Sequence, residues 1–169
     1  MPYIQTLNMS EEDQRHLLEW WNTTEAAKVV ERHLVSLVSE LRLLPEASHA
    51  DGMVLFYRAV SEISYGYAGV RGCIRRSFTR EYSHALRKNM VKCHSFAHKY
   101  AVDAKVLIEV IAKQVRGKDA VDLINRIRES LKKNDELLKE MAAKADVFYG
   151  TEALQSLQKE VEKSTALPM

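Results

Sequence analysis

Three histidines lie in a segment rich in arginine and lysine, and their spacing sets the chemistry they could perform. His94 and His98 are four residues apart, so on a helix both imidazoles lie on one face, within reach of a single metal ion. His84 lies ten residues before His94, too far along a helix axis to bind the same ion. Two imidazoles without a carboxylate beside them make a weak ligand set. We therefore predict no metal site.

Arg87 and His94 form the second pairing that could do chemistry. Six residues separate them, so both project from nearly the same side of a helix. The spacing is similar to the arginine–histidine element of the HEPN family of all-helical ribonucleases. That resemblance implies an arginine that binds phosphate and a histidine that assists attack by the ribose 2′-hydroxyl. Lys88 stands where the family commonly carries a polar residue. A ribonuclease of HEPN type is therefore an alternative, and the chain as a whole is assigned to no family.

Other catalytic arrangements find little support in the sequence. Cys93 and His94 are adjacent, which on a helix aims their side chains about 100° apart. Gly66, Gly69 and Gly72 do not follow a strand, so they do not form a phosphate-binding loop. Each glycine costs about 1 kcal/mol relative to alanine inside a helix, and we expect a locally weak helix end there, with close approach by another helix as the alternative. The sequence favours a protein that is not an enzyme and has no cofactor.

Charge is strongly segregated along the chain. The whole chain has a net charge of +2, whereas residues 71–100 carry eight basic residues and one acid, a net charge of +7. On a helical wheel, many of these side chains share one broad face, and such a face attracts phosphates, acidic proteins or anionic lipids. The predicted basic face, with its neighbour Arg76, consists of Arg76, Arg80, His84, Arg87, Lys88, His94, His98 and Lys105. The alternative is an ordinary solvated helix face beside the acidic first segment.

Apolar residues recur at steps of three and four along most of the chain, the period of amphipathic helices. Ser10 followed by Asp13 resembles a capping box that opens the first segment, and Pro45 closes it. The polar residues 22–24 leave open whether this segment is one helix or two. The second helix is expected from near Ser48 to a turn near Arg76-Ser77. The third is expected from about Phe78 to Arg116, with Gly117 as a C-terminal cap. The fourth is expected from Asp119 to a stop at Gly150, and a short final helix is expected around Leu154, Leu157 and Val161.

These segments predict an all-α fold. No apolar–polar alternation of strand length occurs, and short connections between long helices favour antiparallel packing. The hydrophobic fraction of 46% provides a core, and six glycines and three prolines are too few for a disordered or collagen-like chain. Asn134 falls on the apolar seam of the fourth helix, where a polar residue can fix the register. We predict a single antiparallel bundle of four long helices plus a short C-terminal helix, with residues 1–163 as one domain and 164–169 as a frayed tail.

The ends and the apolar runs bear on the compartment. The sequence starts without a basic region followed by an apolar one, so no secretory signal peptide is recognisable, and no run is apolar enough to predict a transmembrane segment. We expect a cytoplasmic or nuclear protein with reduced thiols. The predicted function is a non-catalytic helical-bundle binding protein that acts through its exposed helix faces. A protein partner, an anionic partner (nucleic acid or a phospholipid surface) and self-assembly into a homo-oligomer or structural subunit all remain open.

Overall fold

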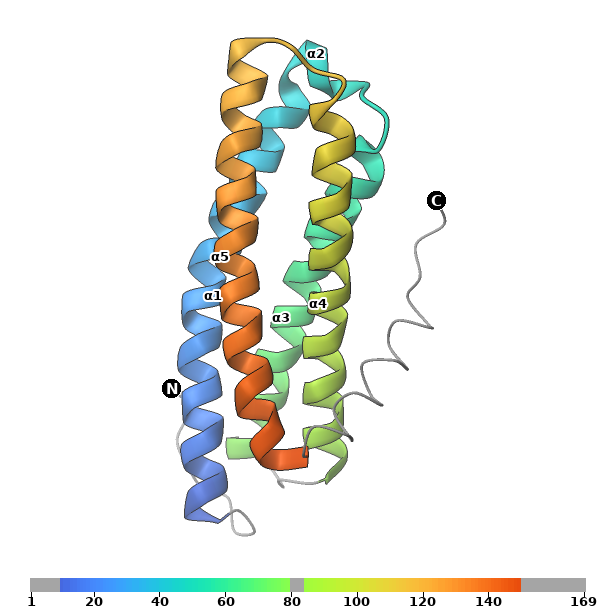
Figure 1. The fold of residues 1–169 in the computed structure, drawn as a ribbon. Coiled ribbons are helices and arrows are strands. Elements are labelled where there is room, and N and C mark those ends of the chain that lie inside the picture. The colour runs from blue at the N-terminus through green and yellow to red at the C-terminus, as the bar shows by residue number, and fades with distance from the viewer. Residues whose placement is uncertain (1–9, 80–83, 150–169) are drawn as a thin grey trace.

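The computed structural model describes residues 10–79 and 84–149 as a series of helices (Figure 1). The elements are α1 (Glu11–Leu43), α2 (Pro45–Ser48), α3 (Met53–Thr79), α4 (His84–Ala112) and α5 (Lys118–Tyr149). No strand occurs among these residues. The predicted all-α bundle of four long helices is confirmed. The predicted short C-terminal helix and the tail 164–169 lie outside the described residues.

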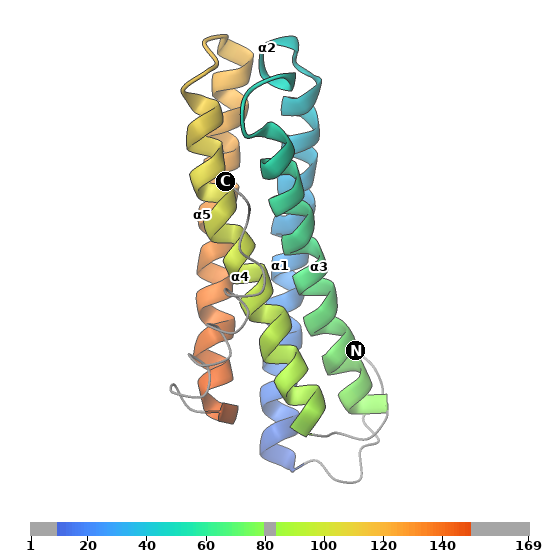
Figure 2. The ribbon, with the colours of Figure 1, turned by 90° about the vertical axis from the view of Figure 1, so that its right-hand side faces the viewer.

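The four long helices run alternately up and down, as Figures 1 and 2 show. α1 packs against α3 and α5, and α4 packs against the same two helices from the other side. α1 and α4 therefore occupy opposite corners of the bundle, as do α3 and α5. This arrangement places α5 against one flank of α4. α5 therefore covers part of the predicted basic face.

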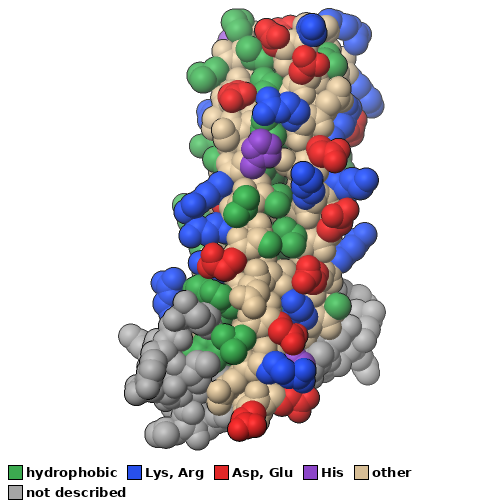
Figure 3. Space-filling view, turned by 90° about the vertical axis from the view of Figure 1, so that its left-hand side faces the viewer, with side chains coloured by type: hydrophobic (Ala, Val, Ile, Leu, Met, Phe, Trp, Pro, Cys, Tyr) green, Lys and Arg blue, Asp and Glu red, His purple; other side chains and the backbone are tan. Residues whose placement is uncertain are grey.

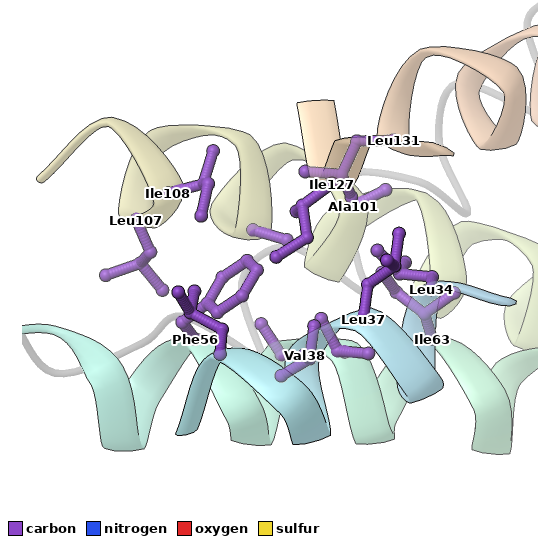
Figure 4. Packing of buried hydrophobic residues seen from close by; sticks show 14 of the residues in the cluster. Leu34, Leu37, Val38, Phe56, Ile63, Ala101, Leu107, Ile108, Ile127 and Leu131 are labelled. Atoms are coloured by element: carbon purple, nitrogen blue, oxygen red, sulfur yellow. The ribbon is translucent and has the colours of Figure 1, made fainter. Parts of the chain in front are cut away.

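The core lies along the bundle axis and draws on all four long helices. Leu34 of α1, Phe56 of α3, Ile108 of α4 and Ile127 of α5 belong to one buried cluster, and each is at most 1% exposed (Figure 4). Burying a side chain of this kind stabilises the fold by roughly 1.5–3 kcal/mol. A second cluster, which includes Trp20 and Cys73, fills the end of the bundle where α1 begins. The apolar positions expected from the helical period thus form the core.

The first helix follows the sequence signals closely. The Ser10 hydroxyl accepts a hydrogen bond from the Asp13 amide at 3.1 Å, as a capping residue does. The helix continues through residues 22–24, and the hydroxyls of Thr23 and Thr24 donate to carbonyls of the same helix. Leu44 adopts an extended conformation before proline, and Pro45 then begins the short α2, a position that suits a residue without an amide hydrogen.

Three expected boundaries are wrong. α3 begins at Met53 and not near Ser48, because the chain first turns at Gly52, whose φ of 86° suits glycine. The turn expected near Arg76-Ser77 does not form. α3 continues to Thr79, so Phe78 belongs to α3 and does not begin the next helix.

The third wrong boundary is the expected helix cap at Gly117. α4 ends earlier, at Ala112, and the Gly117 carbonyl accepts from the Val121 amide at the start of α5. The Gly117 amide in turn donates to the Glu46 carboxylate at 3.1 Å. Gly117 therefore caps the start of α5 and not the end of α4.

The glycines of α3 do not mark a weak helix end, so that interpretation is corrected. A Cβ atom placed on Gly66 would lie 2.7–3.0 Å from Ala97 atoms, including its backbone, and one on Gly69 would lie 2.6 Å from Cys93 Sγ. Both glycines face α4 and allow a close approach of the two helices. Gly72 has open space beside it.

A polar contact crosses the centre of the bundle. The Tyr67 hydroxyl of α3 donates to Asn134 Oδ1 of α5 at 2.5 Å, and Asn134 is fully buried. Burial also holds the pKa of the Tyr67 phenol above its usual value. The bond joins two helices at opposite corners of the bundle. Asn134 is thus a buried polar residue at a seam position, and its role in fixing the register stays a prediction.

Candidate functional site: the basic α3–α4 surface

The last turns of α3 and the first half of α4 lie side by side in antiparallel directions (Figure 2). Contacts of Gly66 with Ala97 and of Cys73 with Asn89 fix this alignment. The described stretches 71–79 and 84–100 contain seven lysines or arginines and no aspartate or glutamate. We call the exposed Arg75, Arg76 and Lys88, together with the partly buried Arg87 and Lys92, the basic α3–α4 surface.

Ion pairs close one margin of this surface. Arg71 forms an ion pair with Glu25 of α1 at 2.7 Å and lies over the Trp21 ring at 4.4 Å. The hydrogen bond from Arg71 holds the pKa of the Glu25 carboxyl below its usual value. Lys99 pairs with Asp103 at 2.5 Å in the same way, on α4. The cationic character is therefore concentrated beyond these two pairs, toward the end of the bundle where α3 ends and α4 begins.

His94 requires a correction, because it does not lie on a solvated face. Its side chain is 1% exposed, and its Nε2 lies 2.9 Å from the Leu138 carbonyl of α5. Burial lowers the pKa of His94 to about 4, and the nearby His98 acts in the same direction. His94 lies on the flank of α4 that α5 covers. A helical wheel separates this flank from the core, but it cannot show that a neighbouring helix will cover it.

Lys105 lies on the same flank and is partly neutralised. It forms an ion pair with Asp135 of α5 at 2.5 Å, with 45% of its side chain exposed. His98 is exposed to solvent. The predicted basic face of α4 is therefore interrupted where α5 packs, and Lys105 lies apart from the basic α3–α4 surface.

Three of the remaining predicted residues, Arg76, Arg87 and Lys88, lie near the junction of α3 and α4. Arg76 and Lys88 are exposed, and Arg87 is partly buried with an inaccessible Nε. Arg80 and the side chain of His84 lie outside the description. The predicted basic face does not include Arg75. A turn was expected near Arg76-Ser77, so the end of α3 was not expected to lie beside α4.

The Arg87–His94 pairing does not form a site open to solvent. The His94 imidazole is buried and bonded to a backbone carbonyl, so in this arrangement it is not placed to take a proton from a ribose hydroxyl. His94 and His98 likewise differ, one being buried and the other exposed. Within residues 10–79 and 84–149, no group of three or more histidine, cysteine or acidic side chains is arranged to hold a metal ion.

The opposite face of the bundle has a different charge pattern. Figure 3 views the side on which α1 and α5 lie, and its acidic and basic side chains are interspersed. Pairs such as Lys144 with Glu140, at 3.2 Å, are typical of this face. Opposite charges at short distances cancel the field that a distant anion would experience. The contrast singles out the carboxylate-free stretches of α3 and α4.

Comparison of the chain with models of known protein families, with curated proteins and with solved structures finds no match. None of the described helices is both long enough and apolar enough to cross a membrane.

Proposed function

We propose that this chain is a non-catalytic binding protein that holds an anionic partner on the basic α3–α4 surface. One observation carries the proposal: two stretches without carboxylates, from different helices, lie side by side and bring Arg75, Arg76 and Lys88 to the surface. Clustered positive charges raise the local concentration of anions and accelerate their encounter with the protein. Arginine also forms paired hydrogen bonds with phosphate oxygens.

A phosphate-bearing partner fits this chemistry. Arg75 and Arg76 are exposed, so their guanidinium groups can contact phosphates along a nucleic-acid backbone. Such contacts position the partner without reading a base sequence. Phospholipid headgroups offer the same phosphate chemistry, so the assay includes anionic vesicles as a second ligand.

The test compares two variants that lose the same charge at different places. The first carries Arg75→Gln, Arg76→Gln and Lys88→Gln, and the control carries Lys132→Gln, Lys133→Gln and Lys139→Gln on α5. All six side chains are exposed, so both variants should keep the fold. We expect the first variant to bind a fluorescent single-stranded RNA about tenfold or more weakly at low salt, because it removes phosphate contacts.

The control variant should bind like the wild type, because the interspersed charges of α5 give no concentrated field. Equal weakening by both variants would show a general effect of net charge and contradict the proposal. Binding only to anionic vesicles, lost in the first variant alone, would keep the surface and change the partner to a membrane.

A further inference from the structure

The two cysteines of the chain lie against each other across the junction of α3 and α4. Cys93 of α4 packs directly over Gly69 of α3, where a Cβ atom would lie 2.6 Å from its sulfur. Cys73 lies one turn further along α3, and its thiol is hydrogen-bonded to that of Cys93. The absence of a side chain at Gly69 thus brings the two sulfur atoms together. This contact between the sulfur atoms could not be predicted from the sequence, because twenty positions separate the cysteines.

The surroundings of Cys73 favour its thiolate. Asn89 Nδ2 donates a hydrogen bond to Cys73 Sγ at 3.3 Å, and the guanidinium of Arg76 lies close by. The contact with the Cys93 thiol, together with these donors, holds the pKa of Cys73 below its usual value. The same contact holds the pKa of Cys93 above its usual value, so Cys93 keeps its proton. One sulfur is therefore a nucleophile and the other a thiol in contact with it.

Access to this pair is from the Cys93 side. Cys73 is fully buried within the second core cluster, whereas Cys93 is partly exposed. An oxidant can therefore reach the pair from the partly exposed side of Cys93. Reactive cysteines of redox proteins combine thiolate character with such access and with a second cysteine nearby.

We propose that Cys73 and Cys93 are a redox-active pair that a peroxide converts to an intramolecular disulfide. The Cys73 thiolate attacks one peroxide oxygen, the O–O bond breaks, and the sulfenic acid of Cys73 forms with release of one water after protonation. The Cys93 thiol then attacks the Cys73 sulfur, the S–S bond forms, and the sulfenic oxygen leaves as a second water. In sum, two thiols give up two electrons and two protons, and hydrogen peroxide becomes two waters. This site does not depend on the proposed binding of an anion.

The test treats the full-length protein with hydrogen peroxide, alkylates the remaining thiols and measures the intact mass and the peptide map without reduction. We expect a monomer that has lost two hydrogens, that carries no alkyl group, and whose peptides around Cys73 and Cys93 are joined. Dithiothreitol should restore two alkylatable thiols. Chains linked only to other chains, or chains with both thiols still alkylated, would overturn the proposal.

A second measurement separates this chemistry from simple proximity. Asn89→Ala and Arg76→Gln each remove a group that stabilises the Cys73 thiolate, so disulfide formation at neutral pH should slow by up to about tenfold for each pKa unit restored. Lys88→Gln is the matched control, a neighbouring exposed cation, and should react like the wild type. Equal rates in all four proteins would show that the local donors do not activate Cys73.

Discussion

Single buried polar residues make the stability of this bundle depend on pH. His94 is enclosed by α4, α5 and the Trp20 ring of α1, whose centre lies 6.1 Å from that of the imidazole. Among the described residues, His98 adds a charge effect on His94, and it further disfavours protonation. Folding therefore holds His94 in the neutral form under conditions where an unfolded chain would protonate it.

The sign of the pH effect follows from this difference. The pKa of His94 is about 4 in the folded state, against about 6.5 in an unfolded chain. Between these values the unfolded state binds more protons, so the free energy of unfolding decreases as the pH falls from 6.5 toward 4. The shift corresponds to about 3 kcal/mol across that window. Urea unfolding of the wild type at several pH values measures it.

Other groups also titrate in this range, and a difference between variants removes them. We expect His94→Gln to lose most of this pH dependence, while His98→Gln, one turn away and exposed, keeps it. Parallel stability curves for the wild type and His94→Gln would contradict the assigned burial of His94.

At the scale of single residues, the sequence predicts a feature only when the contact that produces it is local in the chain. The Ser10 cap is a contact within one turn, and it was predicted correctly. The burial of His94 depends on the position of α5, more than forty residues away along the chain. The Cys73–Cys93 contact depends on the alignment of α3 with α4. No local pattern contains that information.

Among the helices, the approach of α3 to α4 is the feature that shapes both candidate sites. Glycine inside a helix is unfavourable by about 1 kcal/mol relative to alanine, because the unfolded chain gains conformational freedom. At Gly66 the close contact with Ala97 offsets this cost, whereas at Gly72 nothing lies within 4 Å. The sequence shows the glycine spacing, but the partner helix determines which glycines are needed.

Two substitutions test this distinction. Gly72→Ala should stabilise the protein by about 0.5–1 kcal/mol, because the new methyl group enters open space and the helix gains propensity. Gly66→Ala should destabilise it by about 1–3 kcal/mol, because the methyl group would collide with the Ala97 backbone. Chemical unfolding of both variants gives the values. Stabilisation by both substitutions would show that α3 and α4 do not approach closely at Gly66.

The helical period predicted the number and type of the long helices, because each must bury a continuous apolar stripe. The ends were less predictable. Gly117 carries the sequence signal of a helix end, yet its amide binds Glu46, seventy-one positions earlier, and it begins α5 instead. Contacts between distant segments decided these boundaries.

Over the whole molecule, charge is distributed by the packing of the helices. The excess of basic residues in 71–100 was evident from the sequence, but a wheel of one helix placed it around the flank that α5 covers. Packing removes His94 from the surface and partly neutralises Lys105, and it adds Arg75 from the end of α3. A basic surface formed by two helices replaces the basic face of one.

The dependence of RNA binding on salt tests this surface most directly. Each phosphate contact releases bound counterions, so the logarithm of the association constant should fall by about 0.7 per contact for each unit of the logarithm of salt concentration. We expect a clear negative slope for the wild type and for the Lys132, Lys133 and Lys139 control. The slope should be shallower by about 2 when Arg75, Arg76 and Lys88 are replaced by glutamine. A slope that is unchanged in that variant, or equally reduced in the control, would contradict binding at the basic α3–α4 surface.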